Sequence, residues 1–383
     1  MQNPPKLWTV LIYANGNNEL ASIMQQAKEN LEIIGSTSEI NIIILIGRAE
    51  EKLRKIIKPT LHNSSSGKNW TGVRCYYIKK SHSKLLYKYN NLNMADPKTL
   101  YSFLKWAVAA YPAHHYLLIL SGHGCPLVGV MPDFCQRSPY LMGLPEMCQT
   151  INLLYKETGQ SIDLLVLDIC YMNYLEVIYE LGAVQKQSVR YLLTYMGNGP
   201  LEGLPYHLLI EVVQQSCRRG KVVPVANLVA GIVSRFNLNL AAFLIDYDKC
   251  QRIKELVRKF AYTRLLYYNL QDKLDNHTSV FNTPLEIMRA KTEDWNFLNL
   301  YSKFSFHQDN FWIFLLNSHL LQRSDLLIEA NAKEKLEPLV MGPNMVRQYL
   351  KAINPELNSD QLEIIYQKLY DYKKWVNFLT LST

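Results

Sequence analysis

Residues 162–181, IDLLVLDICYMNYLEVIYEL, change their hydrophobic period halfway along. Residues 162–169 form an apolar, β-type run interrupted only by Asp163 and Asp168, which predicts a buried parallel strand. In residues 172–181 the apolar side chains recur at helical spacing, which predicts a helix. Cys170 stands between the two. Because ligands of α/β sheets bind beyond the carboxyl ends of the strands, chemistry is expected at this turn.

Cys170 has two interpretations at this point. A thiol close to a helix N-terminus is a candidate nucleophile, since the partial positive charge of the helix favours the thiolate. Free cysteine is also among the most buried residue types, so an inert core cysteine is the plain alternative.

The surrounding chain predicts strands that alternate with helices. Buried strands are expected at residues 7–14, 40–47, 116–120 and 189–194, a more exposed strand at 73–79 and a last strand at 237–245. Helices are expected at residues 19–34, 97–111, 144–157 and 206–217, and a loop at 124–140. The opening strand–helix–strand order is a βαβ unit, which predicts a parallel sheet.

The expected fold class is therefore α/β: a mostly parallel sheet flanked by helices in residues 1–247, followed by a mainly helical region in residues 248–383. Within that region, residues 251–268 and 359–377 show helical periodicity.

A histidine follows a second buried strand. The strand at 116–120 runs into Ser121-Gly122-His123-Gly124, so His123 also stands at a carboxyl end. A Gly-His-Gly turn alone suits a structural histidine equally well. Two strands of one sheet would nevertheless bring His123 and Cys170 to the same edge, and a cysteine nucleophile needs such a base or imidazolium partner.

Composition narrows the class of protein. The chain has 383 residues, 48% of them hydrophobic and 19% charged, which is enough for a sizeable core and argues against global disorder. The net charge of +8 comes from scattered Lys and Arg, a pattern of solvated surface rather than of a nucleic-acid interface.

The seven cysteines are odd in number and irregularly spaced, with no CxxC pair, which predicts reduced thiols rather than a disulfide framework or a zinc site. No secretory signal and no apolar run long enough to span a bilayer is seen, so the expected location is cytoplasmic, without a membrane. A processed chain would look the same, so secretion is left open.

Several motifs together resemble the clostripain family of cysteine peptidases, which have a caspase-like α/β fold. The resemblance spans about residues 8–210 and rests on residues 8–13 (WTVLIY), 17–20 (NNEL), 94–97 (MADP), 113–120 (AHHYLLIL) leading into His123-Gly124, 143–147 (GLPEM), and 168–181 (DICYMNYLEVIYEL). Their order along the chain is that of the family.

The resemblance implies a cysteine endopeptidase in which Cys170 is the nucleophile and His123 its base or imidazolium partner. It further implies an oxyanion site at the backbone N–H groups of Gly124 and Cys170, and cleavage after Arg or Lys read by Asp168 and Glu202. The alternatives are that Asp168 caps the next helix or orients local amides, and that Glu202 is an ordinary loop acid.

The sequence departs from the family pattern around the expected pocket. Ser121-Gly122-His123 replaces the usual Trp-Asn-His, and Thr194-Tyr195-Met196 stands where a small residue, Ser and an acid are usual. Leu204 replaces a tryptophan. Two wall elements of the expected pocket for basic residues are therefore altered, and Tyr195 would narrow the cleft.

Some family members are zymogens cleaved between the histidine and cysteine segments. Here Arg137 lies in the predicted loop and is the candidate autocleavage site, with Lys156 as a second candidate. Some members need calcium, but this sequence has no EF-hand-like loop, and no cofactor or metal is expected.

Three functions follow from these observations. The first is an endopeptidase that acts on protein or peptide substrates; the second is a weakly active or inactive caspase-like domain that serves as a binding or regulatory module. The third is a thiol acyltransferase, for which the only support is that such enzymes also use a cysteine and a histidine. The sequence does not predict an oligomeric state.

Overall fold

The structure of the protein is a computed structural model, which describes residues 4–61, 70–125, 128–182, 188–218, 221–252 and 336–381. The chain divides into two compact units: Met1–Tyr247 together with Leu336–Thr383, and Asp248–Lys335. Residues 336–381, grouped by sequence with the helical region 248–383, thus share a unit with the sheet. The predicted helix at 251–268 lies almost wholly outside the described residues.

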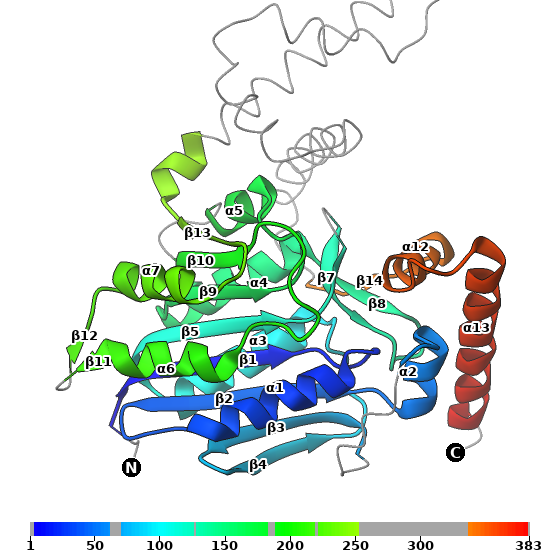
Figure 1. The fold of residues 1–383 in the computed structure, drawn as a ribbon, viewed down its shortest axis with the longest axis horizontal. Coiled ribbons are helices and arrows are strands. Elements are labelled where there is room, and N and C mark those ends of the chain that lie inside the picture. Colours follow the sequence, from blue (N-terminus) through cyan, green and yellow to red (C-terminus); the bar gives the residue numbers. More distant parts are fainter. Residues whose placement is uncertain are drawn as a thin grey trace, which may run out of the picture. The chain divides into compact units, whose positions relative to one another are not determined.

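An eight-stranded sheet forms the centre of the first unit (Figure 1). In spatial order its strands are β13 (Leu240–Leu244), β10 (Val189–Tyr195), β9 (Ile162–Asp168), β5 (Ala113–Ser121), β1 (Lys6–Ala14), β2 (Ile40–Arg48), β3 (Gly72–Lys79) and β4 (His82–Tyr89). The strands from β10 to β2 pair in parallel, and β13, β3 and β4 join antiparallel. The predicted α/β class is therefore confirmed. The sequence analysis did not predict β4, a mostly exposed edge strand with no apolar periodicity.

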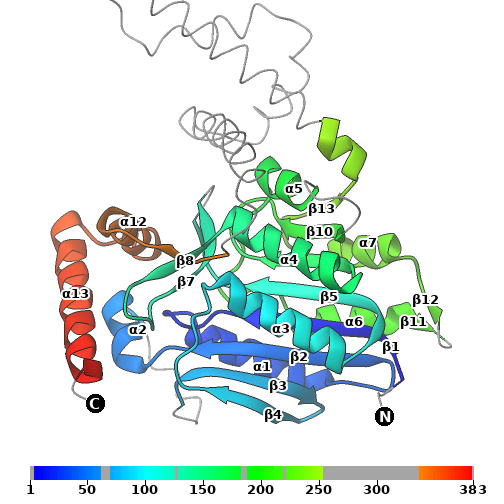
Figure 2. The same ribbon diagram turned by 180° about the vertical axis from the view of Figure 1, so that it is seen from behind.

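Helices cover both faces of this sheet. On one face lie α1 (Ala21–Ile34), α6 (Tyr206–Ser216) and α7 (Val225–Arg235), as Figure 1 shows. Figure 2 shows α3 (Pro97–Ala110) and α4 (Leu144–Thr158) on the other, with α5 (Leu175–Gly182) packed against α4. The predicted start of α3 is confirmed: Pro97 is its first residue, and the Asp96 side chain accepts from the amide of Lys98 over 2.9 Å. The sequence analysis did not predict α7.

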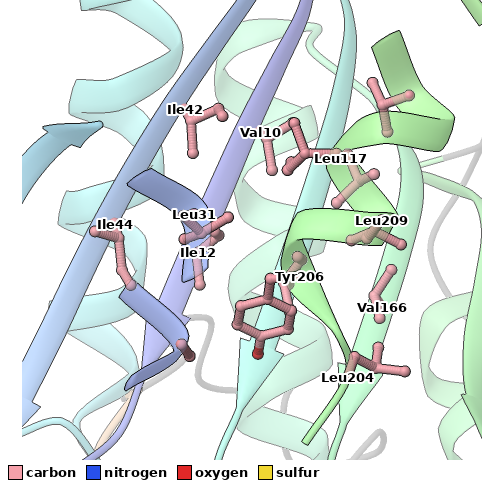
Figure 3. Packing of buried hydrophobic residues seen from close by; sticks show 14 of the residues in the cluster. Val10, Ile12, Leu31, Ile42, Ile44, Leu117, Val166, Leu204, Tyr206 and Leu209 are labelled. Atoms are coloured by element: carbon pink, nitrogen blue, oxygen red, sulfur yellow. The ribbon is translucent and has the colours of Figure 1, made fainter. Parts of the chain in front are cut away.

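The alternation of side chains along the central strands builds two cores. Val10 and Ile12 of β1 point to the face of α1 and α6, where they join one hydrophobic cluster with Leu31 and Leu209 (Figure 3). Tyr13 points to the opposite face, and its ring lies 6.1 Å from that of Phe103 on α3. Every residue of β2 and β9 is buried, which explains their largely apolar sequences.

The segment predicted as a loop at residues 124–140 contains strands instead. β6 (Gly124–Cys125), β7 (Gly129–Asp133) and β8 (Tyr140–Gly143) form a small antiparallel sheet with β14 (Leu339–Val340). The prediction was wrong because these strands are only two to five residues long, too short to show a period. One of them also pairs with a strand from the far end of the chain.

The C-terminal segment packs on this small sheet. Helices α12 (Pro343–Ile353) and α13 (Ser359–Leu381) share a second hydrophobic cluster with α2 (Glu51–Ile57) and with Phe134 and Leu141. The buried Asn354 ties the end of α12 to α2, because its side chain donates to the carbonyl of Ile57 over 3.0 Å. The helix predicted at 359–377 is confirmed as α13, whereas α12 was not predicted.

No helix in the described part of the chain combines the length and the apolarity that crossing a membrane requires.

Candidate active site

The carboxyl ends of β5 and β9 meet at one edge of the sheet. These strands pair in parallel, and their last paired residues are Ser121 and Asp168. His123 and Cys170 each lie two residues beyond that pair, after strands whose axes are about 4.8 Å apart. The amide of Gly122 also donates to the carbonyl of Asp168 over 3.4 Å, so the two segments stay together past the strand ends. The structure thus brings the predicted histidine and cysteine to the same edge.

Cys170 is partly buried, and its sulfur accepts a hydrogen bond from the amide of Gly199 over 3.3 Å. The turn that carries it is strained, because Tyr171 has a φ of 55°, a left-handed conformation that costs about 1–2 kcal/mol in a residue with a side chain. Helix α5 begins at Leu175, three residues later than predicted. Five positions thus separate Cys170 from the first residue of the helix, and the amide at the sulfur comes from the loop after β10.

Burial raises the pKa of four other thiols. The pKa of Cys75 is raised to about 12, and those of Cys125, Cys148 and Cys217 are also raised. Since the thiolate is the nucleophilic form of cysteine, these four side chains are poorly suited to attack a substrate. Cys170, which is partly exposed, has an N–H donor on its sulfur instead.

Gly124, the predicted oxyanion residue, lies directly against the turn that carries Cys170. A Cβ at this position would lie 2.6 Å from Met172 Cε, 2.7 Å from Ile169 Cγ2 and 3.4 Å from the carbonyl oxygen of Cys170. Any side chain here would push the two segments apart, so glycine permits the approach of the segment after β5 to the segment after β9.

His123 pairs with a residue that the sequence analysis did not single out. Its Nε2 lies 2.6 Å from Oε1 of Glu19, which is buried, whereas His123 is 24% exposed. The hydroxyl of Tyr349 on α12 donates to the other carboxylate oxygen over 2.9 Å, and its ring lies edge-on to the imidazole at 5.7 Å. Glu19 follows the turn after the first strand, so the meeting of parallel strand ends could have indicated it. No sequence signal indicates Tyr349, which is 330 residues from Glu19.

The Glu19 carboxylate is held in its ionised form. Burial alone raises the pKa of Glu19, but the charge of His123, the hydrogen bond with it and the hydrogen bond from Tyr349 outweigh burial and lower that pKa. The resulting stabilisation is present above the ordinary pKa of glutamate and is lost as the pH falls through the lowered value.

A buried polar loop fixes the position of Glu19. The side chains of Asn15 and Asn18 donate to the carbonyl of Pro132 over 3.0 and 2.9 Å, and that of Asn17 donates to Asp133 over 2.7 Å. All three asparagines are fully buried, so these bonds are needed to offset the loss of water. The loop after β1 is thereby fastened to β7, the second strand after His123 in the chain.

Asp168 is the centre of a hydrogen-bond network. Its Oδ1 accepts from the hydroxyl of Tyr195 over 2.7 Å and from the amide of Leu204 over 3.1 Å. Its Oδ2 accepts from the hydroxyls of Ser121 and Tyr206 over 2.9 and 2.6 Å. These four bonds fill the lone pairs of a carboxylate. Burial and the charge of Asp168 raise the pKa values of Tyr195 and Tyr206, so both hydroxyls stay protonated donors.

The loop at residues 197–203, which follows β10, contacts both Cys170 and Asp168. Its Gly199 donates to the cysteine sulfur, and a Cβ on Gly203 would lie 2.7 Å from Asp168 Oδ2. Gly203 has a φ of 73° and therefore needs the freedom of glycine. Glu202, the second predicted acid, is exposed in the turn just before it.

Arg137, the candidate cleavage site, is exposed in the bend between β7 and β8. This bend lies on the segment that links His123 to Cys170. Lys156 is also exposed but belongs to the last turn of α4. Among the described residues, no group of three or more His, Cys, Asp and Glu side chains is placed to hold a metal ion.

Replacing Asp168 by asparagine tests the network around it. The amide offers one acceptor oxygen to four donors, so Asp168→Asn is expected to lower the free energy of unfolding by about 2–4 kcal/mol. Tyr195→Phe removes only one donor and is expected to cost about 1 kcal/mol. Urea unfolding followed by circular dichroism measures both, and equal effects of the two variants would contradict the network.

A known peptidase family matches most of this chain. The model of the clostripain family matches residues 12–310. A search of functionally curated proteins finds no match.

Three solved structures are similar over about two thirds of this chain. A secreted cysteine protease from Bacteroides thetaiotaomicron, in complex with an irreversible peptide inhibitor, has 16% identity and a TM-score of 0.48 over 66% of this chain and 70% of that one. An inactive zymogen protease from Parabacteroides distasonis has 18% identity and a TM-score of 0.47 over 68% and 67%. A second structure of a secreted cysteine protease from Bacteroides thetaiotaomicron, called iotapain, has 18% identity and a TM-score of 0.44 over 68% and 72%.

The family match covers most of the sequence and includes both strand ends described above. The chain therefore belongs to the clostripain family of cysteine peptidases.

Proposed function

We propose that the protein hydrolyses peptide bonds with Cys170 as nucleophile and His123 as its proton partner. The observation that carries this proposal is the register of β5 with β9, which sets both residues two positions past one strand pair. The amide of Gly199 supports it, because its hydrogen bond to the sulfur helps to hold Cys170 in place. Proteins or peptides are the substrates.

The reaction would proceed in two steps. In the first, the thiolate attacks the peptide carbonyl carbon and His123 gives its proton to the leaving amine, which forms a thioester on Cys170. In the second, His123 takes a proton from water, and the resulting hydroxide hydrolyses the thioester. The backbone N–H groups of Gly124 and Cys170 would bind the oxyanion, and the close approach of Gly124 to Cys170 supports this assignment.

We assign the peptidase a preference for Arg or Lys before the scissile bond. Asp168 accepts only from neutral donors, and no ion pair in the described part of the chain neutralises it. Glu202 is exposed on the same loop that contacts Asp168 and Cys170. Because the lone pairs of Asp168 are filled, Glu202 is the carboxylate that would meet the substrate cation directly, with Asp168 adding its charge from the sheet edge.

The second candidate function is a weakly active or inactive binding module. One observation favours it: Tyr195 closes over Asp168 and fills the space next to Gly199, where an added Cβ would lie 2.4 Å from the ring. A pocket closed in this way would bind a basic side chain poorly.

Self-processing after Arg137 is also proposed. The exposed bend between β7 and β8 presents an arginine to solvent between the two catalytic segments.

The irregular set of seven cysteines favours a reducing compartment such as the cytoplasm, where Cys170 would remain a thiol.

The dyad is tested with Cys170→Ala and His123→Ala on fluorogenic peptides that differ in the residue before the cut. Each variant is expected to lower kcat/KM by at least about 10³-fold, because nucleophile and base act as a unit. Cys217→Ala is the matched control and should keep wild-type activity. Cleavage that survives Cys170→Ala would contradict the assignment of the nucleophile, whereas silence of the wild type across the whole panel would favour the binding module.

The basic preference is tested with Glu202→Gln. For Arg and Lys peptides kcat/KM is expected to fall about tenfold, because one charge-assisted contact is lost, while any cleavage of neutral peptides stays unchanged. Glu356→Gln removes an exposed carboxylate far along the sequence and serves as control. An equal fall for all peptides would show that Glu202 does not read the basic side chain.

Self-processing is tested by intact mass of the purified chain. The wild type is expected to be cut after Arg137, whereas Cys170→Ala and Arg137→Gln should stay as one chain. Lys156→Gln should be cut like the wild type, since a helical turn does not fit a protease cleft without unfolding. An active enzyme that remains uncut would contradict this proposal.

A further inference from the structure

The pairing of His123 with Glu19 is set apart from the surface ion pairs of this protein. The carboxylate is 3% exposed, lies 2.6 Å from the imidazole and accepts a second hydrogen bond from the partly buried Tyr349. A buried charge needs such partners, since it has lost its contact with water. Both carboxylate oxygens are thus used, one by each neighbour.

We propose that Glu19 is a positioning residue for His123, and that Tyr349 of α12 keeps Glu19 in place. This inference rests on the proposed function of His123 as the proton partner of Cys170. It adds a third and a fourth residue to the catalytic centre, neither of which touches the substrate.

The first consequence concerns the nitrogens of the imidazole. When the Nε2–H group of His123 donates a hydrogen bond to Glu19, the neutral ring carries its lone pair on Nδ1. This nitrogen has no hydrogen-bond partner in the described part of the chain. Nδ1 is therefore the nitrogen left to exchange a proton with Cys170. A base oriented by a third group in this way is the general arrangement of nucleophile, base and orienting residue.

The second consequence concerns charge. During the reaction His123 becomes an imidazolium, and a carboxylate at hydrogen-bond distance stabilises that charge more strongly in a buried site than in water. The titratable groups that face the ring are Glu19 from the loop after β1 and Tyr349 from α12, with Cys170 at the neighbouring strand end.

The third consequence concerns the C-terminal segment. Tyr349 is anchored on both sides, because its ring packs on Phe134 at 5.0 Å and neighbouring residues of α12 enter the second hydrophobic cluster. Residues 336–381 therefore complete the catalytic centre instead of forming a separate annex. The position of α12 would govern how firmly Glu19 is held.

The inference is tested on the full chain with Glu19→Gln and Tyr349→Phe, both of nearly unchanged shape. Glu19→Gln is expected to lower kcat about ten- to hundredfold with little change in KM, a part of what a positioned base contributes. The alkaline limb of the kcat/KM profile should move to lower pH, because the imidazolium loses its carboxylate. Tyr349→Phe should also lower kcat, by about threefold to tenfold, and should also move the alkaline limb to lower pH, since Glu19 loses one hydrogen bond.

Selective ¹⁵N labelling of histidine provides a readout that does not depend on peptidase activity. The chain has nine histidines, and the His123 signals are assigned by their loss in His123→Ala. In the wild type the neutral ring should carry its proton on Nε2, and Glu19→Gln should shift the titration midpoint of His123 to lower pH. Asp163→Asn is the matched control, because Asp163 lies 3.2 Å from His115 at the other ends of β5 and β9.

The possible outcomes separate the two levels of the hypothesis. If Glu19→Gln leaves the tautomer and titration of His123 as in the wild type, or raises kcat, Glu19 is not the positioning residue. If Asp163→Asn moves the His123 signals as far as Glu19→Gln does, the effect is a general one and the inference is overturned. If Cys170→Ala keeps full activity, the proposed function fails, while the His123 titration still decides the role of Glu19.

Discussion

The parallel pairing of β5 with β9 is the constraint on which the rest of the site depends. Ser121 opposite Asp168 fixes where each strand ends, and the next two residues of each strand carry the histidine and the cysteine. Because side chains alternate along a strand, a slip of one residue would turn the whole apolar set of β9 to the wrong face. The register is therefore secured by two buried cores, and the geometry of the site follows from the burial of ordinary apolar side chains.

The second requirement is that buried polar groups find partners. The loop after β1 places three asparagines and Glu19 out of contact with water, and β7 of the small sheet supplies the carbonyl and the carboxylate that the asparagines bind. Such groups cost a few kcal/mol each when they are left unpaired, so this loop is stable only in the company of β7. The C-terminal helices then cover β7 and β8 from outside through the cluster around Phe134 and Leu350. Sheet, loop and C-terminal segment thus depend on one another, although they are far apart in the sequence.

The contrast between elements with local sequence signals and elements that depend on distant partners explains what the sequence could predict. The central strands and most of the helices that cover them have a clear period and local start or stop signals, and so the residue pattern alone was enough to place His123 and Cys170 at one sheet edge. Helices α7 and α12 were missed although each carries apolar residues at helical spacing, and α12 also begins with a proline. The other missed elements lack a local signal: β6 and β7 are too short, β4 is an exposed edge, and β14 pairs with a strand far away in the sequence. Glu19 and Tyr349 belong to this second group. A hydrogen bond between them depends on tertiary packing that no period or cap reveals.

Asp168 shows how closely stability and specificity are joined in this fold. As the last residue of β9 it receives one hydrogen bond from β5, one from β10 and two from the segment after β10, so it joins three strand ends. Tyr195, which the resemblance to the family matches with a serine, adds one of these bonds and occupies space beside the loop that contacts Cys170. A smaller residue at 195 would open room next to the carboxylate and return one of its lone pairs to a ligand, but it would also loosen the loop that donates to the sulfur. The residues that hold the loop at Cys170 are thus the ones that would border the proposed substrate pocket, so more room for a basic side chain would be coupled to a loss of order at Cys170.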